Sequence, residues 1–499
     1  MLLADVVAAS AAVTATRSRT AKTAALAGLL AAAAPHEVAA STAFLAGVPR
    51  QGRIGAGWAT LAALDVAPVA VPALTVGEVD AALSELQAVS GAGSAARRRD
   101  VLAALLGRAT GDEQRFLVGL LTGELRQGAL EGVMLDAVAA AAAVPSTTVR
   151  RAFMLSGRLP ETAVAALSGG SDALASFRLE LGRPVRPMLA SPAQDLDAAL
   201  AEVGSASVEY KLDGARIQVH RDGSAVRVWT RTLREITNSV PELVDLVREL
   251  PCRSIVLDGE TLALADDGRP RPFQETMSRF GAASARELLL RPFFFDCLHL
   301  DGADLLDAPL RDRLPALEQV VAPHRIPSVQ DRTAAPALLE AALAAGHEGV
   351  MVKSLEAPYA AGRRGKAWQK VKPVHTLDLV VFAAEWGHGR RRGWLSNLHL
   401  GARDPDGGPP VMVGKTFKGL TDELLRWQTT ALQEIVVRTD RSGVHVRPEL
   451  VVEIEFDGAQ ASIRYPGGVA LRFARVLRYR PDKDAADTDT IDTVRALLR

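Results

Sequence analysis

The lysines of this chain are few, and their positions mark the residues that could do covalent chemistry. Only nine of the 58 basic residues are lysines, and none lies between Lys22 and Lys211. A guanidinium stays protonated, whereas an ammonium can lose its proton and attack an electrophile. Because arginine fills most basic positions, the lysines clustered between Lys353 and Lys372 are the hardest to attribute to chance.

Four short segments carry charged residues at the ends of strand-like apolar runs. The first is Lys211-Leu212-Asp213-Gly214, and the others are Leu-Asp-Gly-Glu at 257–260, Glu-Gly-Val-Met-Val-Lys at 348–353 and Trp-Gln-Lys-Val-Lys at 368–372. One such segment alone is typical of a solvated strand edge. Four in order predict one pocket lined by two carboxylates and four lysines, which suits a phosphate-bearing substrate and a divalent metal.

Taken in order, these segments closely resemble the motifs of covalent nucleotidyltransferases, specifically the ATP-dependent DNA ligases. The resemblance covers about residues 183–483. The stretch Gly-Glu-Leu-Arg-Gln-Gly-Ala at 123–129 is similar to part of the helical DNA-binding domain of larger ligases. The segment 471–483 resembles the C-terminal motif that closes over ATP, but it has Ala474 where the family usually has proline.

The resemblance implies a reaction in three steps. Lys211 attacks the α-phosphate of ATP and gives lysyl-AMP and pyrophosphate, AMP passes to the 5′-phosphate of a nick, and the 3′-hydroxyl then displaces AMP. The substrate is nicked duplex DNA, in replication, repair or recombination. ATP is the nucleotide, and Mg²⁺ is the expected metal, with Mn²⁺ as a substitute.

The resemblance also assigns residues to the nucleoside. Glu209 resembles an adenine contact, and Phe295 resembles the aromatic residue that stacks on adenine. Arg216 and Glu260 resemble the ribose-binding pair. Arg231 resembles a second contact to the nucleotide or to the 5′-phosphate, which suits the bidentate geometry of a guanidinium.

Further residues are assigned to the phosphates and the metal. Arg364, Lys370 and Lys372 resemble the cations that neutralise the triphosphate, and Lys353 is expected in the same pocket. Phosphoryl transfer depends mainly on positioning and charge stabilisation, so such cations are needed. Glu260 and Glu348 are the metal candidates.

The elements that must position these residues fall into three regions. Residues 1–182 have helical periodicity and are expected to form an all-α DNA-binding domain, with a loop at 168–171 and an extended linker at 182–187. Residues 183–373 are expected to form an α+β nucleotidyltransferase, or adenylation, domain. In it we expect a hairpin turn at 221–224, strands at 293–300 and 349–353, and a helix at 335–345.

Residues 374–499 are expected to form a small β-barrel domain, with an OB-fold as the leading candidate. Strands are expected at 378–385, 451–456 and 461–465. A hairpin is expected around 405–408, and a helix capped by Thr421 is expected to run to 436.

The composition excludes several classes of protein. The 499 residues are 48% hydrophobic and 23% charged with zero net charge, which argues against a disordered or histone-like chain. Two cysteines, Cys252 and Cys297, are too few for a four-cysteine zinc site, which also argues against an NAD-dependent ligase. The apolar run 24–34 is too short to span a bilayer, so we expect a cytoplasmic protein without a membrane segment. We also expect a monomer.

Two alternatives stay open from the residues. One is an RNA ligase or a GTP-using capping enzyme of the same superfamily, against which the long helical region argues. The other is a non-catalytic DNA clamp, and the residues that argue against it are Lys211, Glu260, Glu348, Lys370 and Lys372. The arginine runs at 97–99 and 390–392 are either DNA-backbone contacts or solvated loops.

Overall fold

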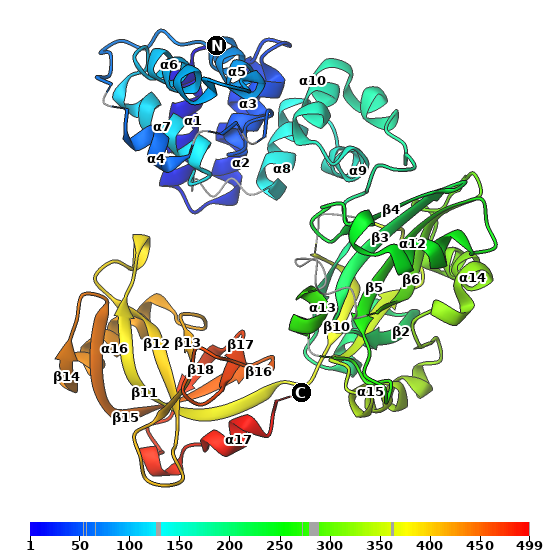
Figure 1. Cartoon of the computed structure of the whole chain (residues 1–499), viewed down its shortest axis with the longest axis vertical. Coiled ribbons are helices and arrows are strands. Elements are labelled where there is room, and N and C mark those ends of the chain that lie inside the picture. The colour runs from blue at the N-terminus through cyan, green and yellow to red at the C-terminus, as the bar shows by residue number, and fades with distance from the viewer. Residues whose placement is uncertain are drawn as a thin grey trace. The chain divides into compact units, whose positions relative to one another are not determined.

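The computed structural model in Figure 1 describes residues 1–498, apart from short gaps. The gaps are Arg53, Ala56, Asp65, 126–130, Pro272, 279–288 and 361–363, and at Phe273, Gln274, Ser278, Arg364 and Arg390 the description is limited to the backbone. The chain divides into two compact units, one of residues 1–209, 213–335 and 351–370 and the other of residues 210–212, 336–350 and 371–499.

The N-terminal region is helical, as its periodicity predicts. Two of the helices begin with a capping box. In each, the N-cap threonine and a glutamate three residues later exchange side-chain-to-backbone hydrogen bonds, and the pairs are Thr75 with Glu78 and Thr110 with Glu113. The apolar faces of the helices form one hydrophobic cluster that includes Leu26. The helices are α1 Leu3–Ala15, α2 Arg19–Ala32, α3 Val38–Leu45, α4 Trp58–Ala62, α5 Val76–Ala88, α6 Ser94–Leu106, α7 Gly111–Thr122, α8 Glu131–Ala141, α9 Ser146–Ser156 and α10 Leu159–Ala175.

The expected loop at 168–171 lies instead within helix α10. The helix kinks there, because Gly170 has non-helical backbone angles with φ of +57°. Glycine adopts this conformation without the steric cost that a Cβ imposes, so the Gly-Gly pair bends the helix rather than ending it. The prediction of a loop was therefore wrong, although the break in regular helix falls at the expected place.

The middle region contains two β-sheets with helices between their strands. One sheet has the order β1-β10-β9-β2-β8, and the other has the order β4-β3-β5-β6-β7. The hairpin predicted at 221–224 joins β3 to β4. The elements are β1 Leu189–Pro192, α11 Leu196–Val203, β2 Ala206–Lys211, β3 Ala215–Asp222, β4 Ala225–Thr230, α12 Pro241–Arg248, β5 Ser254–Ala263, α13 Phe273–Ser278, β6 Leu290–Leu300, β7 Ala303–Asp304, α14 Leu310–Val321, β8 Ser328–Val329, α15 Ala335–Ala344, β9 Gly349–Ser354 and β10 Arg364–Val371.

The alternation of side chains along β3 separates a hydrophobic core from a polar face. Ile217 and Val219 belong to a buried apolar cluster to which α12 and α14 contribute. Arg216 and Gln218 point to the opposite face, since successive side chains in a strand alternate. This second face carries the functional residues described below.

The C-terminal region is rich in strands, and its main sheet has the order β13-β12-β11-β15-β14, with β18 also pairing with β15. Thr421 caps helix α16 as predicted, because its hydroxyl accepts the N–H of Leu424 at 3.1 Å. The hairpin predicted around 405–408 joins β12 and β13. The elements are β11 His375–Trp386, β12 Leu395–Ala402, β13 Val411–Thr416, α16 Asp422–Glu434, β14 Val436–Thr439, β15 Gly443–Phe456, β16 Gly458–Ala461, β17 Val469–Arg472, β18 Arg475–Tyr479 and α17 Ile491–Arg495.

The strand predicted at 461–465 was wrong. Strand β16 ends at Ala461 and pairs with β17, and the residues between them form the connecting turn. The turn is closed by hydrogen bonds from the N–H of Ser462 to Gly468 and from the N–H of Gly468 to Tyr465. Pro466 and the two glycines that follow favour a turn over an extended strand.

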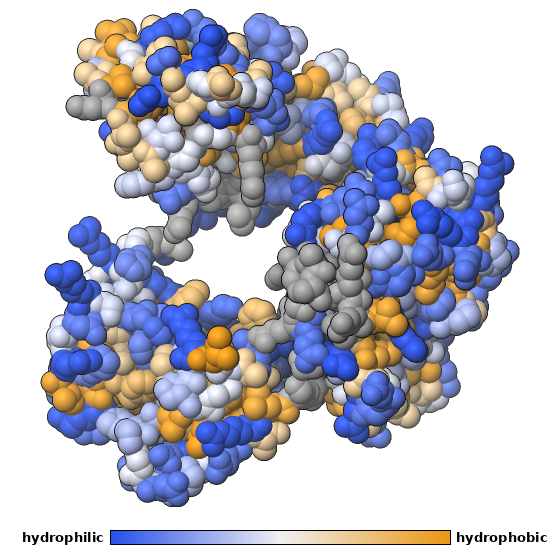
Figure 2. Space-filling model, in the orientation of Figure 1, coloured by the Kyte–Doolittle hydropathy of each residue, from blue (hydrophilic) through white to orange (hydrophobic). Residues whose placement is uncertain are grey.

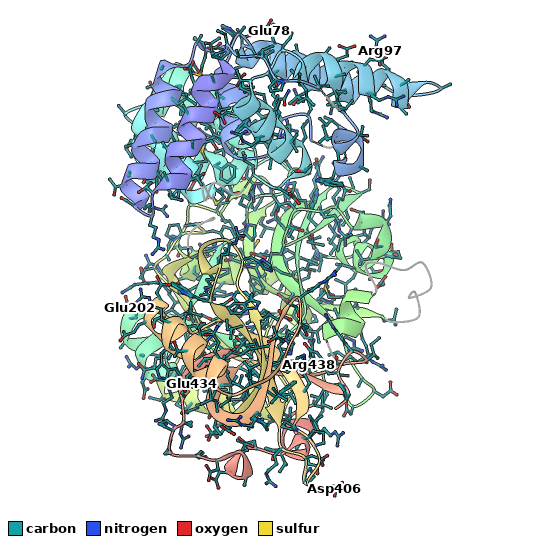
Figure 3. All side chains as sticks on the ribbon, turned by 90° about the vertical axis from the view of Figure 1, so that its left-hand side faces the viewer. Glu78, Arg97, Glu202, Asp406, Glu434 and Arg438 are labelled. Carbon is teal, nitrogen blue, oxygen red and sulfur yellow. The ribbon has the colours of Figure 1, made fainter. Side chains whose placement is uncertain are left out.

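The surface is mixed in character. Figure 2 shows hydrophilic and hydrophobic residues interspersed over one face. Figure 3 labels Glu78 on α5 and Arg97 on α6, which take part in surface ion pairs with Arg108 at 2.7 Å and with Glu85 at 2.8 Å. Among the described residues, no helix is long and apolar enough to cross a membrane.

Candidate active site

Strand β2 ends at Lys211, the lysine with the predicted nucleophilic role. Its ammonium contacts the Glu348 carboxylate, and the two side chains are 19% and 15% exposed. The backbone N–H of Glu348 also donates a hydrogen bond of 3.0 Å to the carbonyl oxygen of Lys211. The predicted nucleophile and a predicted metal ligand are therefore held together by both backbone and side chain.

Two glycines allow the backbone to approach closely around these residues. A Cβ on Gly349, which has φ of +144°, would collide with the carbonyl oxygen of Val371. A Cβ on Gly214 would collide with the carbonyl oxygen of Thr261 on β5. Glycine is therefore favoured at positions 214 and 349 of the motifs, because a larger residue would clash with neighbouring backbone.

Lys372, a predicted phosphate ligand, lies near the same carboxylate. Its Nζ is 3.9 Å from Oε2 of Glu348 and 2.6 Å from Oδ2 of Asp457. Its side chain is only 18% exposed. Two lysines therefore lie near Glu348, and Asp457 provides a second carboxylate next to Lys372.

On the second sheet, Arg216 of β3 lies directly opposite Glu260 of β5, so the predicted ribose-binding residues are neighbours. The guanidinium itself makes a bidentate ion pair with Asp258, from Nε to Oδ1 at 3.0 Å and from Nη2 to Oδ2 at 2.7 Å. Its Nη1 also donates to the carbonyl oxygen of Met188 at 2.6 Å. Such bidentate contacts fix the plane of an arginine.

A buried charge pair lies beside the predicted adenine-stacking residue. The Nζ of Lys353 is 2.5 Å from Oε2 of Glu209, and each side chain is only 2% exposed. The same Nζ lies 4.1 Å from the ring centroid of Phe295 and 4.4 Å from that of Trp368. Burial raises the pKa of Glu209, although Lys353 acts in the opposite direction. These contacts place Glu209, Lys353 and Phe295 in one cluster.

The remaining predicted ligands are less closely grouped. Arg231 is exposed in the turn after β4, and Lys370 is half-buried near the end of β10. The side chain of Arg364 lies outside the described residues, as do residues 126–129 of the stretch predicted to belong to a DNA-binding domain. The structure thus brings Arg216 and Glu260 together, and Glu209 and Phe295 together, but gives no such grouping for Arg231.

The arginine runs are partly engaged in local contacts. Arg98 donates to the carbonyl oxygen of Val89 at 2.5 Å, and Arg391 donates to the carbonyl oxygen of Phe417 at 2.7 Å. The side chain of Arg390 lies outside the described residues. Ala474 is buried next to Phe473, which has a positive φ of 57°. A backbone of this kind is unusual for a residue with a side chain.

Sequence reasoning missed several residues that support the site. Asp258 and Trp368 stood inside recognised motifs without a role, and Tyr359 stood outside them. Asp296, which directly follows Phe295 in the chain, forms a fully buried bidentate pair with Arg313 of helix α14. The signal available for Asp258 was its place two residues before Glu260, which puts both on the same face of β5.

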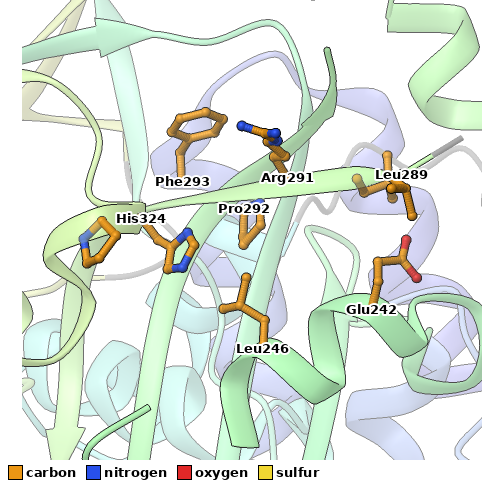
Figure 4. A pocket seen from close by; sticks show the side chains of 9 residues that line it. Glu242, Leu246, Leu289, Arg291, Pro292, Phe293 and His324 are labelled. Atoms are coloured by element: carbon orange, nitrogen blue, oxygen red, sulfur yellow. The ribbon is translucent and has the colours of Figure 1, made fainter. Parts of the chain in front are cut away.

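A separate pocket lies at the edge of the second sheet. It is lined by residues of α12 and the start of β6, together with Pro323 and His324. Figure 4 shows Glu242 and Leu246 extending from the helix toward the strand that carries Pro292. The lining includes none of the predicted site residues. In the described part of the chain, no cluster of three or more His, Cys, Asp or Glu side chains could hold a metal ion.

Lys211 and Glu348 at adjoining strand ends, and Arg216 and Phe295 on a second sheet, are the residue types expected of a nucleotidyltransferase domain. Family comparisons agree with this class. Residues 187–372 match the family described as ATP dependent DNA ligase domain, 59–139 match DNA ligase N terminus, and 391–483 match ATP dependent DNA ligase C terminal region.

Similar proteins extend over the full chain. A probable DNA ligase of Saccharopolyspora erythraea is 70% identical over 99% of this chain and 98% of its own. A probable DNA ligase of Rhodococcus jostii is 67% identical over 100% of both chains. A solved structure described as Pmar-Lig_Pre is 16% identical with a TM-score of 0.63, over 95% of this chain and 99% of its own, and shows a shared fold.

The chain belongs to the ATP-dependent DNA ligase family. As a member it is an enzyme, a DNA ligase that uses ATP. The sequence-based prediction of the family is thereby confirmed, as is the arrangement of a helical N-terminal region, a nucleotidyltransferase domain and a strand-rich C-terminal region. The more specific OB-fold assignment and the boundaries after 182 and 373 stay predictions.

Proposed function

We propose that this enzyme seals nicks bearing a 5′-phosphate and a 3′-hydroxyl in duplex DNA, with Lys211 as the carrier of AMP. The Nζ of Lys211 attacks the α-phosphorus of ATP, forms a P–N bond and releases pyrophosphate. An oxygen of the 5′-phosphate at the nick then attacks the phosphorus of the bound AMP, so that a P–O–P bond forms, the P–N bond breaks and Lys211 is released. The 3′-hydroxyl then attacks the 5′-phosphorus, and AMP leaves.

The contact between Lys211 and Glu348 is the observation that carries this proposal. An ammonium is inert until it loses its proton, so a lysine nucleophile needs neighbours that orient it and a route for that proton. Glu348 orients the amine at the end of β2, and its carboxylate contacts the amine that must lose a proton. Arginine at position 211 could not serve, because a guanidinium does not deprotonate.

The rest of the ATP site follows the two sheets. We propose that Glu209 and Phe295 contact adenine and that Arg216 and Glu260 contact ribose. The cluster around Lys353 supports the first pair, because it holds both side chains in a fixed, dry environment. The proposed contacts to the phosphates are Arg231, Arg364, Lys370 and Lys372.

We propose Mg²⁺ as the metal of the reaction. Mg²⁺ binds proteins through one or two carboxylates and completes its shell with waters and substrate phosphates. Glu348 and Glu260 would hold it, with Mn²⁺ as a substitute, and the half-buried Glu348 beside two lysines is typical of such a phosphate site. When bound, the ion would supply charge stabilisation for the triphosphate.

Duplex DNA is the proposed partner, and the helical region is its proposed binding domain. The chain has zero net charge, so we propose that the contacts come from dispersed arginines and helix N-termini. We expect a monomer that acts in the cytoplasm, and a role in replication, repair or recombination.

A sealing assay tests the proposal directly. The full chain is incubated with ATP, Mg²⁺ and a duplex in which one strand carries a nick and a fluorescent label. The proposal predicts conversion to the sealed strand on a denaturing gel, dependent on ATP. Sealing only of nicked RNA duplexes would instead support the RNA ligase, and DNA binding without sealing would support the clamp.

A further inference from the structure

Tyr359 is buried between the two sheets and joins three groups through one hydroxyl. Tyr359 is only 2% exposed to solvent. The hydroxyl donates to Oδ2 of Asp258 at 2.6 Å and accepts the backbone N–H of Met188 at 3.0 Å. It also accepts an N–H from Nη2 of Arg216 at 3.3 Å. The phenol thus uses its proton and both of its lone pairs.

These contacts close a ring of hydrogen bonds around Arg216. The arginine is bound by Asp258 through Nε and Nη2, and by the carbonyl of Met188 through Nη1. With the Tyr359 hydroxyl added as a second acceptor at Nη2, every nitrogen of the guanidinium donates to a described residue. These bonds hold the guanidinium in one orientation, so the network determines the direction in which Arg216 can offer a further hydrogen bond.

The aromatic residues limit the remaining freedom of the guanidinium. Its Cζ lies 5.6 Å from the ring centroids of both Phe295 and Trp368. Tyr359 packs edge-on against Trp368, with centroids 5.9 Å apart at 85°. Burial and the neighbouring Asp258 raise the pKa of Tyr359 well above its ordinary value, so the phenol keeps its proton and the hydrogen bond to Asp258 keeps its direction.

We infer that Tyr359 is a positioning residue that sets the enzyme's preference for a ribonucleotide, by fixing the N–H that Arg216 presents to a ribose hydroxyl. The inference rests on the proposed contact between Arg216 and ribose. Tyr359 does not touch the nucleotide in this account. Its hydroxyl acts only through Arg216 and Asp258.

The variant Tyr359→Phe tests the hydroxyl while it keeps the ring and its packing on Trp368. The full chain, freed of bound AMP with pyrophosphate, is assayed for self-labelling with ATP, 2′-deoxy-ATP and 3′-deoxy-ATP. We expect kcat/KM for ATP to fall about tenfold, the size expected for one hydrogen bond to a charged group. One of the two deoxy analogues lacks the hydroxyl that Arg216 is proposed to bind. The kcat/KM of Tyr359→Phe for that analogue should differ from the wild-type value by less than about threefold. Tyr359→Phe should therefore lose most of the preference for ATP over that analogue.

A control removes a different hydroxyl that also donates one hydrogen bond and accepts a backbone N–H. The hydroxyl of Thr429 accepts the N–H of Leu395 at 3.0 Å and donates to the carbonyl of Leu425 at 2.6 Å, in the C-terminal region. Thr429→Val should lose stability in a similar way but keep the ratio of ATP to deoxy-ATP. An equal loss with all three nucleotides in Tyr359→Phe, or no change in their ratio, would overturn the inference.

Arg216→Lys separates this inference from the proposed function. If Arg216→Lys keeps the wild-type preference for ATP, the proposed ribose contact is wrong. If Arg216→Lys loses the preference and Tyr359→Phe keeps it, the ribose contact stands and the role of Tyr359 is wrong. Absence of self-labelling in the wild type would instead contradict the proposed function.

A second readout needs no variant at Tyr359. The chain has four tyrosines, so protein containing 3-fluorotyrosine gives a simple fluorine spectrum. The Tyr359 resonance is assigned by replacing the other three tyrosines with phenylalanine one at a time. A non-hydrolysable ATP analogue should shift this resonance more than its 2′- or 3′-deoxy counterpart. Identical shifts with all of the nucleotides would contradict the inference even if Tyr359→Phe does not fold.

Discussion

The backbone N–H of Glu348 donates to the carbonyl oxygen of Lys211 at 3.0 Å, while the side chains of the same two residues form an ion pair. The position of the lysine therefore depends on strand pairing as well as on its own side chain. A change at Glu348 can remove charge without removing the backbone bond. A substitution at Glu348 therefore separates the effect of its charge from the effect of its backbone on the position of Lys211.

Replacing Glu348 with glutamine should slow self-labelling by roughly a hundredfold, the usual size for losing one electrostatic element of phosphoryl transfer. Glutamine keeps a hydrogen-bond acceptor for Lys211 but removes the negative charge that a metal needs. The measurement is the labelling rate across Mg²⁺ concentrations. The control is Glu202→Gln, whose carboxylate pairs with Lys366 at 2.6 Å on the surface. A wild-type rate and metal dependence in Glu348→Gln would remove this residue from the metal site.

Self-labelling should require Mg²⁺ or Mn²⁺, prefer ATP to GTP and release pyrophosphate. The buried Glu209–Lys353 pair gives the proposed adenine site fixed polar groups, and such groups discriminate strongly against a base with the wrong donors. Radiolabelled ATP, GTP and NAD are compared under the same conditions. Equal labelling by GTP would favour a capping-type enzyme, and labelling by NAD would contradict the assignment.

A fragment that begins near Gly182 should label itself but seal nicks poorly. The hydrophobic cluster of the helical region ends at Phe177, and a separate cluster lies within 215–355, so the catalytic part has its own core. Specific protein–DNA interfaces bury roughly 1,000–2,500 Å² of protein surface, more than a small domain easily supplies. Sealing at about 150 mM salt should fall at least roughly tenfold.

The contrary result for this truncation is a full sealing rate at the same salt concentration. That outcome would leave the helical region with a role other than DNA binding. Adding residues 1–182 as a separate chain is the corresponding rescue experiment, and we expect it to restore part of the sealing activity.

The stability of the C-terminal region should depend on Glu385 in a defined pH range. Burial opposes ionisation, but hydrogen bonds from Lys415, His399 and Asn397 outweigh it and lower the pKa of Glu385 to about 2. A pKa below the ordinary 4.5 means that the ionised carboxylate stabilises the fold above that pH and that this contribution is lost as the pH falls toward 2.

Glu385→Gln should therefore lower the melting temperature by about 2 °C at pH 7. The difference from wild type should shrink below pH 4.5. The control is Glu449→Gln, which removes an exposed ion pair with Arg447 at 2.5 Å and should change little. A difference that stays constant from pH 7 to pH 3 would show that the charge of Glu385 is not the stabilising feature.

The sequence predicted those parts of the site that are local in the chain. Lys211 and Glu348 stand at the ends of apolar runs, so their motifs can be read without knowing the fold. The close approaches of Gly214 to Thr261 and of Gly349 to Val371 are seen only in the structure. The hairpin at 221–224 and the cap at Thr421 were predictable for the same reason, since turns and caps depend on neighbouring residues.

Relationships between distant strands could not be predicted in the same way. The bond of Tyr359 to Asp258 joins residues 101 positions apart, and it depends on the packing of two sheets. The pair of Arg313 with Asp296 likewise depends on how helix α14 lies against β6. At 461–465 the apolar and polar residues suggested a strand, but the Pro-Gly-Gly sequence that follows favoured a turn.

The central claim is that Lys211 carries AMP, and one measurement tests it most directly. Purified full-length protein is incubated with ATP and Mg²⁺, digested, and analysed by mass spectrometry for the peptide that bears AMP. The account predicts the adduct on Lys211, its loss in Lys211→Ala and in Lys211→Arg, and its retention in Lys366→Ala, where the lysine is on the surface. An AMP adduct on another residue, or one that persists in either Lys211 variant, would contradict the account.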